Sequence, residues 1–331
     1  MTLRTLLDDA ARYDAEYGHN LACHLSMALV ALARLGAGEQ RLEQFAASYA
    51  ERLHPAPPPE PWPSGEPWKS GFGDPRTWPA YRTLFNDWLD HEGAGVVLAQ
   101  ALPPLMRGVG AAAFHGLIRA AYAVAAGHSH ELADALAYWA CRWFTLGDPR
   151  AERTSNDERD PAEVLARLRI AKPRAPLIAE RMALVAQHPA FARTAAALRI
   201  DDPEHTLQQL ATIAARLYAA SGNFTVLHLV TSAHAMRVLL PWIDDDDRPD
   251  AVQLYWQAFV AGHAASGLQL AAQGEAVQAW DTIVAAAIAS DDDRFIKLVD
   301  SCREQERACG GSVWREAASR ALRERQAKSA G

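Results

Sequence analysis

Residues 21–36 read LACHLSMALVALARLG, a stretch in which apolar residues recur every three or four positions. The residues that share this stripe are Leu21, Leu25, Ala28, Leu29, Leu32 and Leu35. This spacing predicts an amphipathic helix that packs on a core. Gly36 stands where a helix C-cap is expected. His24 lies among the leucines, on the side of the helix that the pattern predicts to be buried.

The same spacing continues through most of the chain. It covers residues 111–126, 131–145, 162–171, 176–187, 204–221, 224–240, 250–271, 275–289 and 291–308. Alternating Val/Ile/Thr-rich segments are nearly absent, so strands are not expected to build the core. The sequence therefore predicts an all-α, multi-helix globular unit with ten or more helices. The polar loop 147–161 allows two helical halves, 1–146 and 162–331, around a central pocket.

Composition narrows the class of protein. The chain has 331 residues, 50% of them hydrophobic, and a net charge of −7. This balance disfavours nucleic acid or an anionic membrane as the main partner. Four cysteines without a CxxC pair suggest neither a disulfide framework nor a cysteine zinc site. With no signal-peptide pattern and no long uncharged apolar run, we expect a cytoplasmic protein with no membrane span; the oligomeric state is left open.

Besides the polar loop 147–161, two segments interrupt the helical pattern. Residues 54–79 hold nine prolines together with Trp62, Trp68 and Trp78. They are either an irregular loop fixed over the core by its tryptophans, or part of an entrance to an aromatic-lined pocket. The acidic residues within 241–249 have no calcium-loop spacing and predict a solvated turn.

Three histidines fall on apolar helical stripes. They are His24, His115 and His228. Any one of them can be a hydrogen-bonded core histidine, but three buried imidazoles need partners for six ring nitrogens. A shared metal ion would satisfy them together, and neutral imidazole is a good ligand for iron, zinc or copper. His234 is a weaker candidate, because it lies about 120° around the helix from His228.

Lys297 is the second unusual residue. Ser290 reads as the N-cap of a helix with acidic residues in its first turn. That helix then places Lys297 between apolar neighbours. The lysine either extends its amine to solvent or is desolvated with a lowered pKa. A neutral amine can act as a base or form a carbamate with carbon dioxide.

Other signatures of catalytic sites are missing. Glu51 and His54 form one Glu-x-x-His motif, but it has no second copy and runs into Pro55. This disfavours a carboxylate-bridged di-iron bundle. The chain has no dinucleotide fingerprint, no P-loop and no nucleophile elbow.

Five blocks together resemble the questin oxidase-like family. They are CHLSMALVALARLGA (23–37), AAFHGLIRAAYA (112–123), ALAYW (135–139), FTVLHLVTSAHAMR (224–237) and SDDDRFIKLV (290–299). The resemblance implies an oxygenase that acts on an aromatic, anthraquinone- or polyketide-like substrate with dioxygen, by oxygen insertion or C–C cleavage. It further implies one non-haem Fe(II) with histidine ligands and a carboxylated lysine, and NADPH as a further cofactor in some relatives.

Carried onto this chain, the resemblance places the metal ligands at His24, His115, His228 and Lys297. The family pattern S-D-D-x-H-x-x-K has Arg294 where a histidine ligand is expected. Arginine cannot ligate a cation. The site then holds iron with fewer histidines, recruits His234 or His263, or has lost its metal.

The leading hypothesis is an iron oxygenase in which Lys297 is a carbamate ligand or base. Arg119 and Tyr122 share the His115 face, and we expect them to stabilise a phenolate or peroxo anion. The alternatives are a metal-free helical binding protein for a flat hydrophobic ligand, favoured by Arg294, and a scaffold whose buried histidines are structural.

Overall fold

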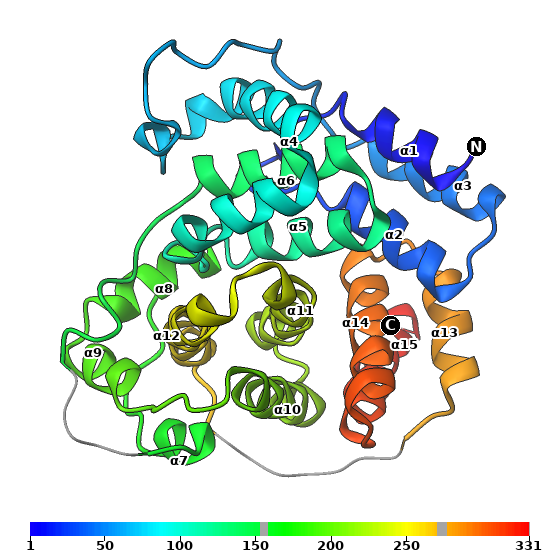
Figure 1. The fold of residues 1–331 in the computed structure, drawn as a ribbon. Coiled ribbons are helices and arrows are strands. Elements are labelled where there is room, and N and C mark those ends of the chain that lie inside the picture. The colour runs from blue at the N-terminus through cyan, green and yellow to red at the C-terminus, as the bar shows by residue number, and fades with distance from the viewer. Residues whose placement is uncertain (153–157, 270–276, 331) are drawn as a thin grey trace. The chain divides into compact units, whose positions relative to one another are not determined.

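The computed structural model describes residues 1–152, 158–269 and 277–330. Within these ranges the chain forms fifteen α-helices, four short 3-10 helices and one small hairpin (Figure 1). The prediction of an all-α fold is confirmed. The chain divides into two compact units, one of residues 1–144 with 284–300 and the other of residues 145–283 with 301–331. Each unit is described separately below.

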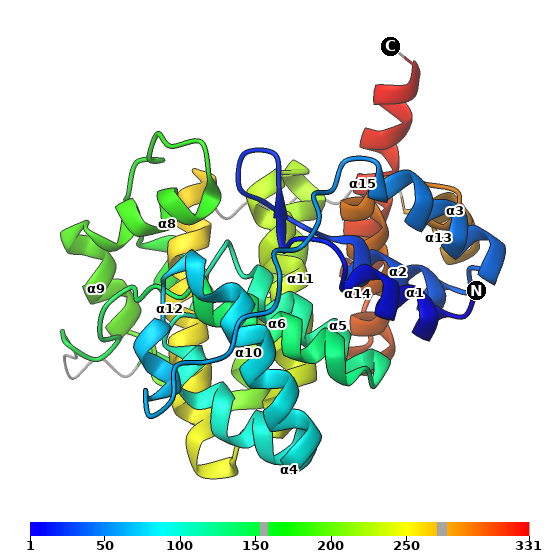
Figure 2. The same cartoon turned by 90° about the horizontal axis from the view of Figure 1, so that it is seen from above.

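The first unit contains the N-terminal helices and the start of a C-terminal one. Its elements are α1 (Leu3–Ala10), β1 (Glu16–Tyr17), β2 (Leu21–Ala22), α2 (Leu25–Leu35), α3 (Glu39–Ala50), η1 (Trp68–Gly71), η2 (Pro75–Thr77), α4 (Trp78–Met106), α5 (His115–Ala126), α6 (Ser129–Cys141), the end of α13 (Trp280–Ile288) and the first half of α14 (Asp293–Cys309). Helix α6 packs against both α4 and α5, and α2 packs against α5. Figure 2 shows these helices from a second direction.

Helices α5 and α6 approach closely at a glycine. A Cβ atom added to Gly116 would lie 2.6 Å from the Cβ of Trp139. A side chain is therefore excluded at this position, because two carbon atoms cannot approach so closely. The glycine fixes the first turn of α5, which carries His115, against a fully buried tryptophan.

Two predicted helices begin later than the spacing indicated. Residues 21 and 22 belong to β2, which pairs with β1, so α2 begins at Leu25 with His24 as its N-cap. Helix α5 begins at His115 and not at residue 111, because Ala112, Ala113 and Phe114 have φ between +46° and +69°. Apolar spacing cannot reveal such turns, because both segments consist of apolar residues as a buried helix face does.

Five helices lie outside the stretches that the spacing singled out. They are α1, α3, α4, α9 (Pro189–Ala196) and α15 (Val313–Ala330). Helix α4 is interrupted at Gly93, where φ is +76°. Residues 153–157 of the predicted polar loop, and 275–276 of a predicted helix, lie outside the described residues.

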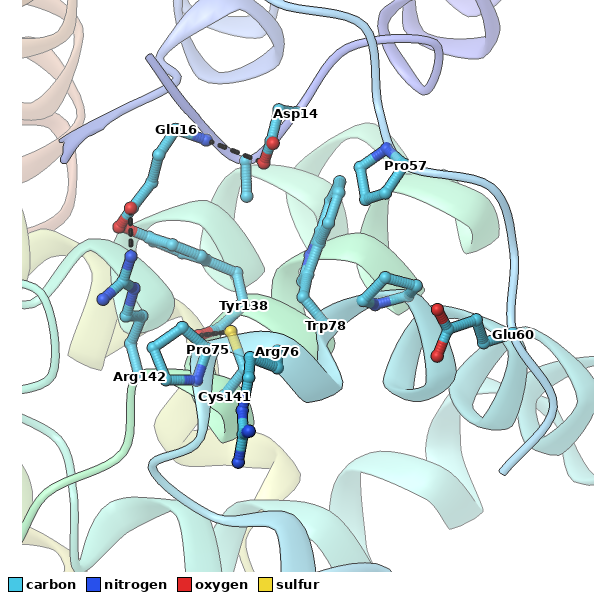
Figure 3. A pocket seen from close by; sticks show the side chains of 12 residues that line it. Asp14, Glu16, Pro57, Glu60, Pro75, Arg76, Trp78, Tyr138, Cys141 and Arg142 are labelled. Atoms are coloured by element: carbon cyan, nitrogen blue, oxygen red, sulfur yellow. Dashed lines mark hydrogen bonds and ion pairs between the residues drawn. The ribbon is translucent and has the colours of Figure 1, made fainter. Parts of the chain in front are cut away.

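The proline-rich segment is fixed to the first unit by aromatic contacts. The ring of Trp62 lies 4.5 Å from that of Tyr81, and Trp68 packs edge to face with Phe85 at 5.7 Å. The interpretation of a loop held by its tryptophans is thereby supported. Pro57 and Glu60 of the same segment also line a cavity of about 290 Å³, together with Tyr138 of α6 (Figure 3).

The second unit is a separate helical assembly. Its further elements are α7 (Pro161–Ala166), α8 (Ile178–Ala186), α9, α10 (Pro203–Ser221), α11 (Phe224–Leu239), η3 (Leu240–Trp242), η4 (Asp245–Asp247), α12 (Arg248–Ser266) and α15. Helix α11 packs against α10 and α12, and α10 packs against α15. Among the described residues, no helix combines the length and the apolar character needed to cross a bilayer.

Candidate functional site

Two of the predicted histidines meet inside the first unit. The Nε2 atoms of His24 and His115 lie 2.8 Å apart, and their ring planes differ by only 13°. Their exposed fractions are 4% and 8%, so the pair is enclosed by protein. The two imidazoles, which come from the start of α2 and the start of α5, therefore present their Nε2 atoms to each other.

The opposite nitrogen of each ring already has an acceptor. Nδ1 of His24 donates to the carboxylate of Asp293, and Nδ1 of His115 donates to the backbone carbonyl of Ala112. Because a carbonyl or an ionised carboxylate only accepts, the ring proton sits on Nδ1 in both histidines. In the neutral rings both Nε2 atoms then carry lone pairs, and these face each other.

A facing pair of lone pairs requires a shared cation or an extra proton. Burial, reinforced by the charge of Lys297, lowers the pKa of His24 to about 4. The extra proton is therefore disfavoured at neutral pH. Histidine ligands of metal ions usually donate their second ring N–H to a carboxylate or a backbone carbonyl. His24 and His115 share this arrangement.

The Ala112 carbonyl, which accepts the hydrogen bond of His115, belongs to a strained turn. Ala112, Ala113 and Phe114 have φ of +46°, +56° and +69°, and none of them is glycine. Left-handed backbone at a non-glycine residue costs on the order of 1 kcal/mol or more. The fold therefore maintains an unfavourable backbone directly before His115, where it aims the Ala112 carbonyl at the imidazole.

Asp293, the partner of His24, is the first residue of α14. The side chain of Asp292 accepts from the backbone N–H of Arg294 and Phe295, at 3.1 and 3.2 Å. The N-cap function thus belongs to Asp292, and the expectation that Ser290 fills it is wrong. Ser290 instead accepts from Asp292 N at 2.9 Å. The cap leaves the Asp293 carboxylate available to His24.

Lys297 follows Asp293 by one helical turn and is only 3% exposed. The alternative in which its amine reaches solvent is therefore excluded. Burial lowers the pKa of Lys297 to about 8, although the negative charge of Asp293 acts in the opposite direction. A substantial fraction of the amine is neutral slightly above neutral pH. This agrees with the expectation of a desolvated lysine.

Arg119 and Tyr122 have acidic partners in the structure. The Arg119 guanidinium donates to both carboxylate oxygens of Glu131, at 2.6 and 2.9 Å. Tyr122 donates to Asp300 at 3.1 Å. Glu131 thus neutralises the charge of Arg119, and Asp300 accepts the hydroxyl proton of Tyr122. Their predicted role in stabilising a substrate anion stays a prediction.

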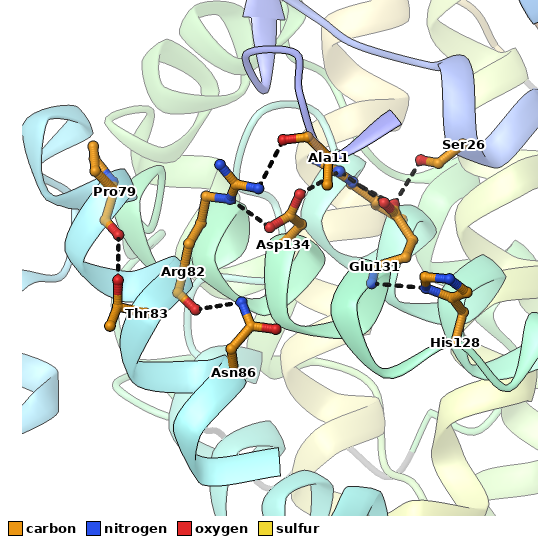
Figure 4. A network of polar contacts seen from close by, with 10 residues as sticks. Ala11, Ser26, Pro79, Arg82, Thr83, Asn86, His128, Glu131 and Asp134 are labelled. Carbon is orange, nitrogen blue, oxygen red and sulfur yellow. Dashed lines mark hydrogen bonds and ion pairs between the residues drawn. The ribbon is translucent and has the colours of Figure 1, made fainter. Parts of the chain in front are cut away.

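A polar network surrounds Glu131 (Figure 4). Ser26 of α2 donates to Glu131 at 2.6 Å, while Arg82 of α4 donates to Asp134 at 2.5 Å. Glu131 and Asp134 lie one turn apart on α6 and are almost fully buried. The network ties α2, α4 and α5 to α6, and so fixes the helices that carry the two histidines.

The remaining histidine candidates belong to the second unit. His228 is buried on α11, and its Nδ1 donates to the carbonyl of Phe224 at 2.9 Å, the same pattern as in His115. Nδ1 of His234 lies 3.4 Å from the guanidinium of Arg237, and His263 is buried on α12. The ligand roles of these three residues stay predictions.

Sequence reasoning did not find Asp293 and Glu131 as partners of predicted site residues. The i, i+4 spacing of Asp293 and Lys297 was a signal for the first, and acidic residues within the apolar helix 131–145 were a signal for the second. In the described part of the chain, no three His, Cys, Asp or Glu side chains form a group that could hold a metal ion. The His24–His115 pair would supply two ligands.

Comparison with known proteins identifies the family of the chain. The sequence profile described as questin oxidase-like matches residues 19–302, which include His24, His115 and Lys297. A comparison with curated proteins finds no match. Since the profile covers most of the chain, the protein belongs to the questin oxidase-like family.

Proposed function

We propose that the protein is an iron-dependent oxygenase whose metal ion is bound by Nε2 of His24 and Nε2 of His115. The observation that carries this proposal is the 2.8 Å separation of the two Nε2 atoms. In both rings the Nδ1 proton is donated to another acceptor. Metal–imidazole bonds are about 2.1 Å long, so two such ligands on one ion stand about 3 Å apart. Imidazole suits iron as a ligand.

Lys297 supplies a further ligand in this proposal. Its neutral amine attacks carbon dioxide, forms an N–C bond and releases a proton, which yields an anionic carbamate with two oxygen atoms. Burial favours the neutral amine that this reaction requires.

The protein groups have separate tasks. Bound iron would activate dioxygen and act as a Lewis acid. Asp293 and the Ala112 carbonyl hold the two imidazoles in the tautomer that leaves Nε2 available. Membership of the family supports an oxidoreductase with a small-molecule, polyketide-like substrate. Oxygen insertion or C–C cleavage of an aromatic ring is the proposed reaction, and a role for NADPH stays a prediction.

Metal analysis of protein expressed in iron-supplemented medium tests the proposal. We expect wild-type protein to retain close to one iron per chain, and His24→Ala and His115→Ala to lose most of it. His91→Ala is the matched control, because His91 is exposed and donates to the carbonyl of Asp87. Retention of iron by both site variants would contradict the proposal.

A metal-free binding protein is the second candidate, and Arg294 favours it. The guanidinium lies one turn before Lys297, and its charge opposes a bound cation. This candidate predicts that iron-supplemented wild-type protein contains no stoichiometric metal. The same measurement therefore separates the two functions.

A further inference from the structure

Helix α3 contacts both sides of the hydrogen bond between His24 and Asp293. Its first turn holds the segment that precedes Asp293, and its last turn holds the backbone of His24. Figure 1 shows α3 beside the connection from the end of α13 to α14, which belongs to the same unit. Apolar spacing did not single out this helix, so its relation to the site comes from the contacts alone.

Arg41 holds the chain just before Asp293. Its guanidinium donates to the backbone carbonyls of Ile288 and Ser290, both at 2.6 Å, and to the carboxylate of Asp291 at 2.8 Å. The first of these acceptors ends α13, and the other two belong to the turn that leads into α14. Hydrogen bonds from a charged donor are roughly twice as strong as those between neutral groups. The three bonds therefore fix the backbone up to two residues before the Asp293 carboxylate.

Tyr49 holds the other partner of the hydrogen bond. Its hydroxyl oxygen accepts from the backbone N–H of His24 at 3.0 Å, and the tyrosine is 1% exposed. His24 is the N-cap of α2, and its side chain makes no cap hydrogen bond. The first N–H groups at the start of a helix have no intrahelical acceptor. Tyr49 supplies one for the residue that carries the imidazole.

Both contacts come from one face of α3. Arg41, Phe45 and Tyr49 follow one another at intervals of four residues, which places them on the same side of the helix. The Arg41 guanidinium lies 5.7 Å from the ring centroid of Phe45, and the rings of Phe45 and Tyr49 lie 5.6 Å apart. This face links the segment that carries Asp293 to the backbone that carries His24.

We propose that Arg41 and Tyr49 are positioning residues, which hold the Asp293 carboxylate and the His24 imidazole within hydrogen-bonding distance. The inference rests on the proposed function, in which this bond keeps the ring proton on Nδ1 and leaves Nε2 of His24 available to a metal ion. Mutation of the groups that orient metal ligands typically lowers metal affinity about 10- to 100-fold. Arg41 and Tyr49 act through the backbone, so we expect the lower end of this range, about tenfold.

Long-range ¹H–¹⁵N NMR spectra test the positioning itself, on full-length protein from which metal has been removed with a chelator. The spectra show which imidazole nitrogen carries the proton, and the His24 signals are those missing from His24→Ala. At neutral pH we expect the proton on Nδ1 in wild-type protein, and a mixture of Nδ1–H and Nε2–H tautomers in Arg41→Met and in Tyr49→Phe. Tyr49→Phe keeps the ring and removes only the acceptor, so it tests the proposal even where Arg41→Met does not fold.

Two matched controls make the same chemical changes away from the site. Tyr81→Phe removes another buried hydroxyl, which donates to a backbone carbonyl at 2.7 Å. Arg248→Met removes another guanidinium that contacts both a backbone carbonyl, that of Ile243, and an aspartate, Asp245. Both controls should keep the His24 proton on Nδ1.

Titration with Fe(II) in competition with a chelator separates this inference from the proposed function. We expect wild-type protein to bind Fe(II) about tenfold more tightly than Arg41→Met or Tyr49→Phe. A mixture of tautomers in the two variants, with no Fe(II) binding by wild-type protein, would contradict the proposed function and support the positioning roles. A variant that keeps the wild-type tautomer would overturn the role of that residue, whatever its affinity for Fe(II).

Discussion

His24 and His115 approach each other through atoms that both carry lone pairs. Their Nε2 atoms lie 2.8 Å apart. Each Nδ1–H is donated to another acceptor, so neither Nε2 carries the ring proton. Two neutral imidazoles in these tautomers repel each other at this separation. In the proposed function a shared cation would convert this repulsion into attraction, and it would account for the left-handed turn before His115.

The proposed carbamate on Lys297 predicts a spectroscopic signal. When wild-type protein is equilibrated with ¹³C-bicarbonate, we expect a carbamate carbon resonance that is absent from Lys297→Met. Lys69→Met is the control, because Lys69 is exposed on the surface. The same signal in Lys297→Met, or none in wild-type protein, would contradict the assignment.

Arg294 is expected to weaken metal binding. Its positive charge lies on the first turn of α14 and acts on both His24 and Lys297. Replacing it in Arg294→Gln should raise the affinity for iron about tenfold, which corresponds to about 1.4 kcal/mol. Competition with a chelator measures the change. Arg303→Gln, further along the same helix, should leave the affinity as in wild-type protein.

The buried ion pair of Arg119 and Glu131 predicts a large effect on stability. Glu131→Ala removes the bidentate partner of Arg119, which is only 6% exposed. We expect this variant to lower the free energy of unfolding by about 3–5 kcal/mol. Urea denaturation measures this. The double variant Arg119→Met/Glu131→Leu should recover most of the loss, because it removes both charges.

An exposed pair provides the comparison for that measurement. Asp9→Ala breaks the contact of Asp9 with Arg12 on the surface, and it should cost no more than about 1 kcal/mol. If Glu131→Ala were as mild as Asp9→Ala, the network around Glu131 would not hold the helices in place.

The burial of His263 leads to a prediction of how the free energy of unfolding depends on pH. Burial lowers its pKa in the folded protein from 6.5 to about 4. Between these values the unfolded chain binds a proton that the folded chain does not, so the free energy of unfolding falls as the pH decreases from 6.5 to 4. The contribution is on the order of 3 kcal/mol.

The variant His263→Gln should reduce this acid sensitivity, while His19→Gln, at an exposed position, should retain it. Urea denaturation at several pH values provides the measurement. An identical pH dependence in wild-type protein and His263→Gln would show that His263 is not the group responsible.

Apolar spacing was sufficient to predict the all-α fold and the burial of His24 and His115, but for Lys297 it left a solvent-reaching and a buried amine as alternatives. Each lies on or beside a stripe of apolar residues, and burial of a stripe is a local consequence of helix geometry. The prediction did not extend to their partners. Asp293 lies 269 residues from His24 along the chain, and only the tertiary fold brings them together.

The spacing of apolar residues also did not predict where α2 and α5 begin. The turn before His115 is made by Ala112, Ala113 and Phe114, which carry none of the glycine signals of left-handed backbone. Trp78 was noted as part of an irregular segment, but it is the first residue of α4.

The most direct test of the central claim is an anomalous difference map at the iron absorption edge, from crystals of protein expressed with supplementary iron. We expect one strong peak within coordination distance, about 2.1 Å, of both Nε2 of His24 and Nε2 of His115. A fully occupied iron elsewhere in the protein, or a short Nε2–Nε2 contact with no peak beside it, would contradict the claim.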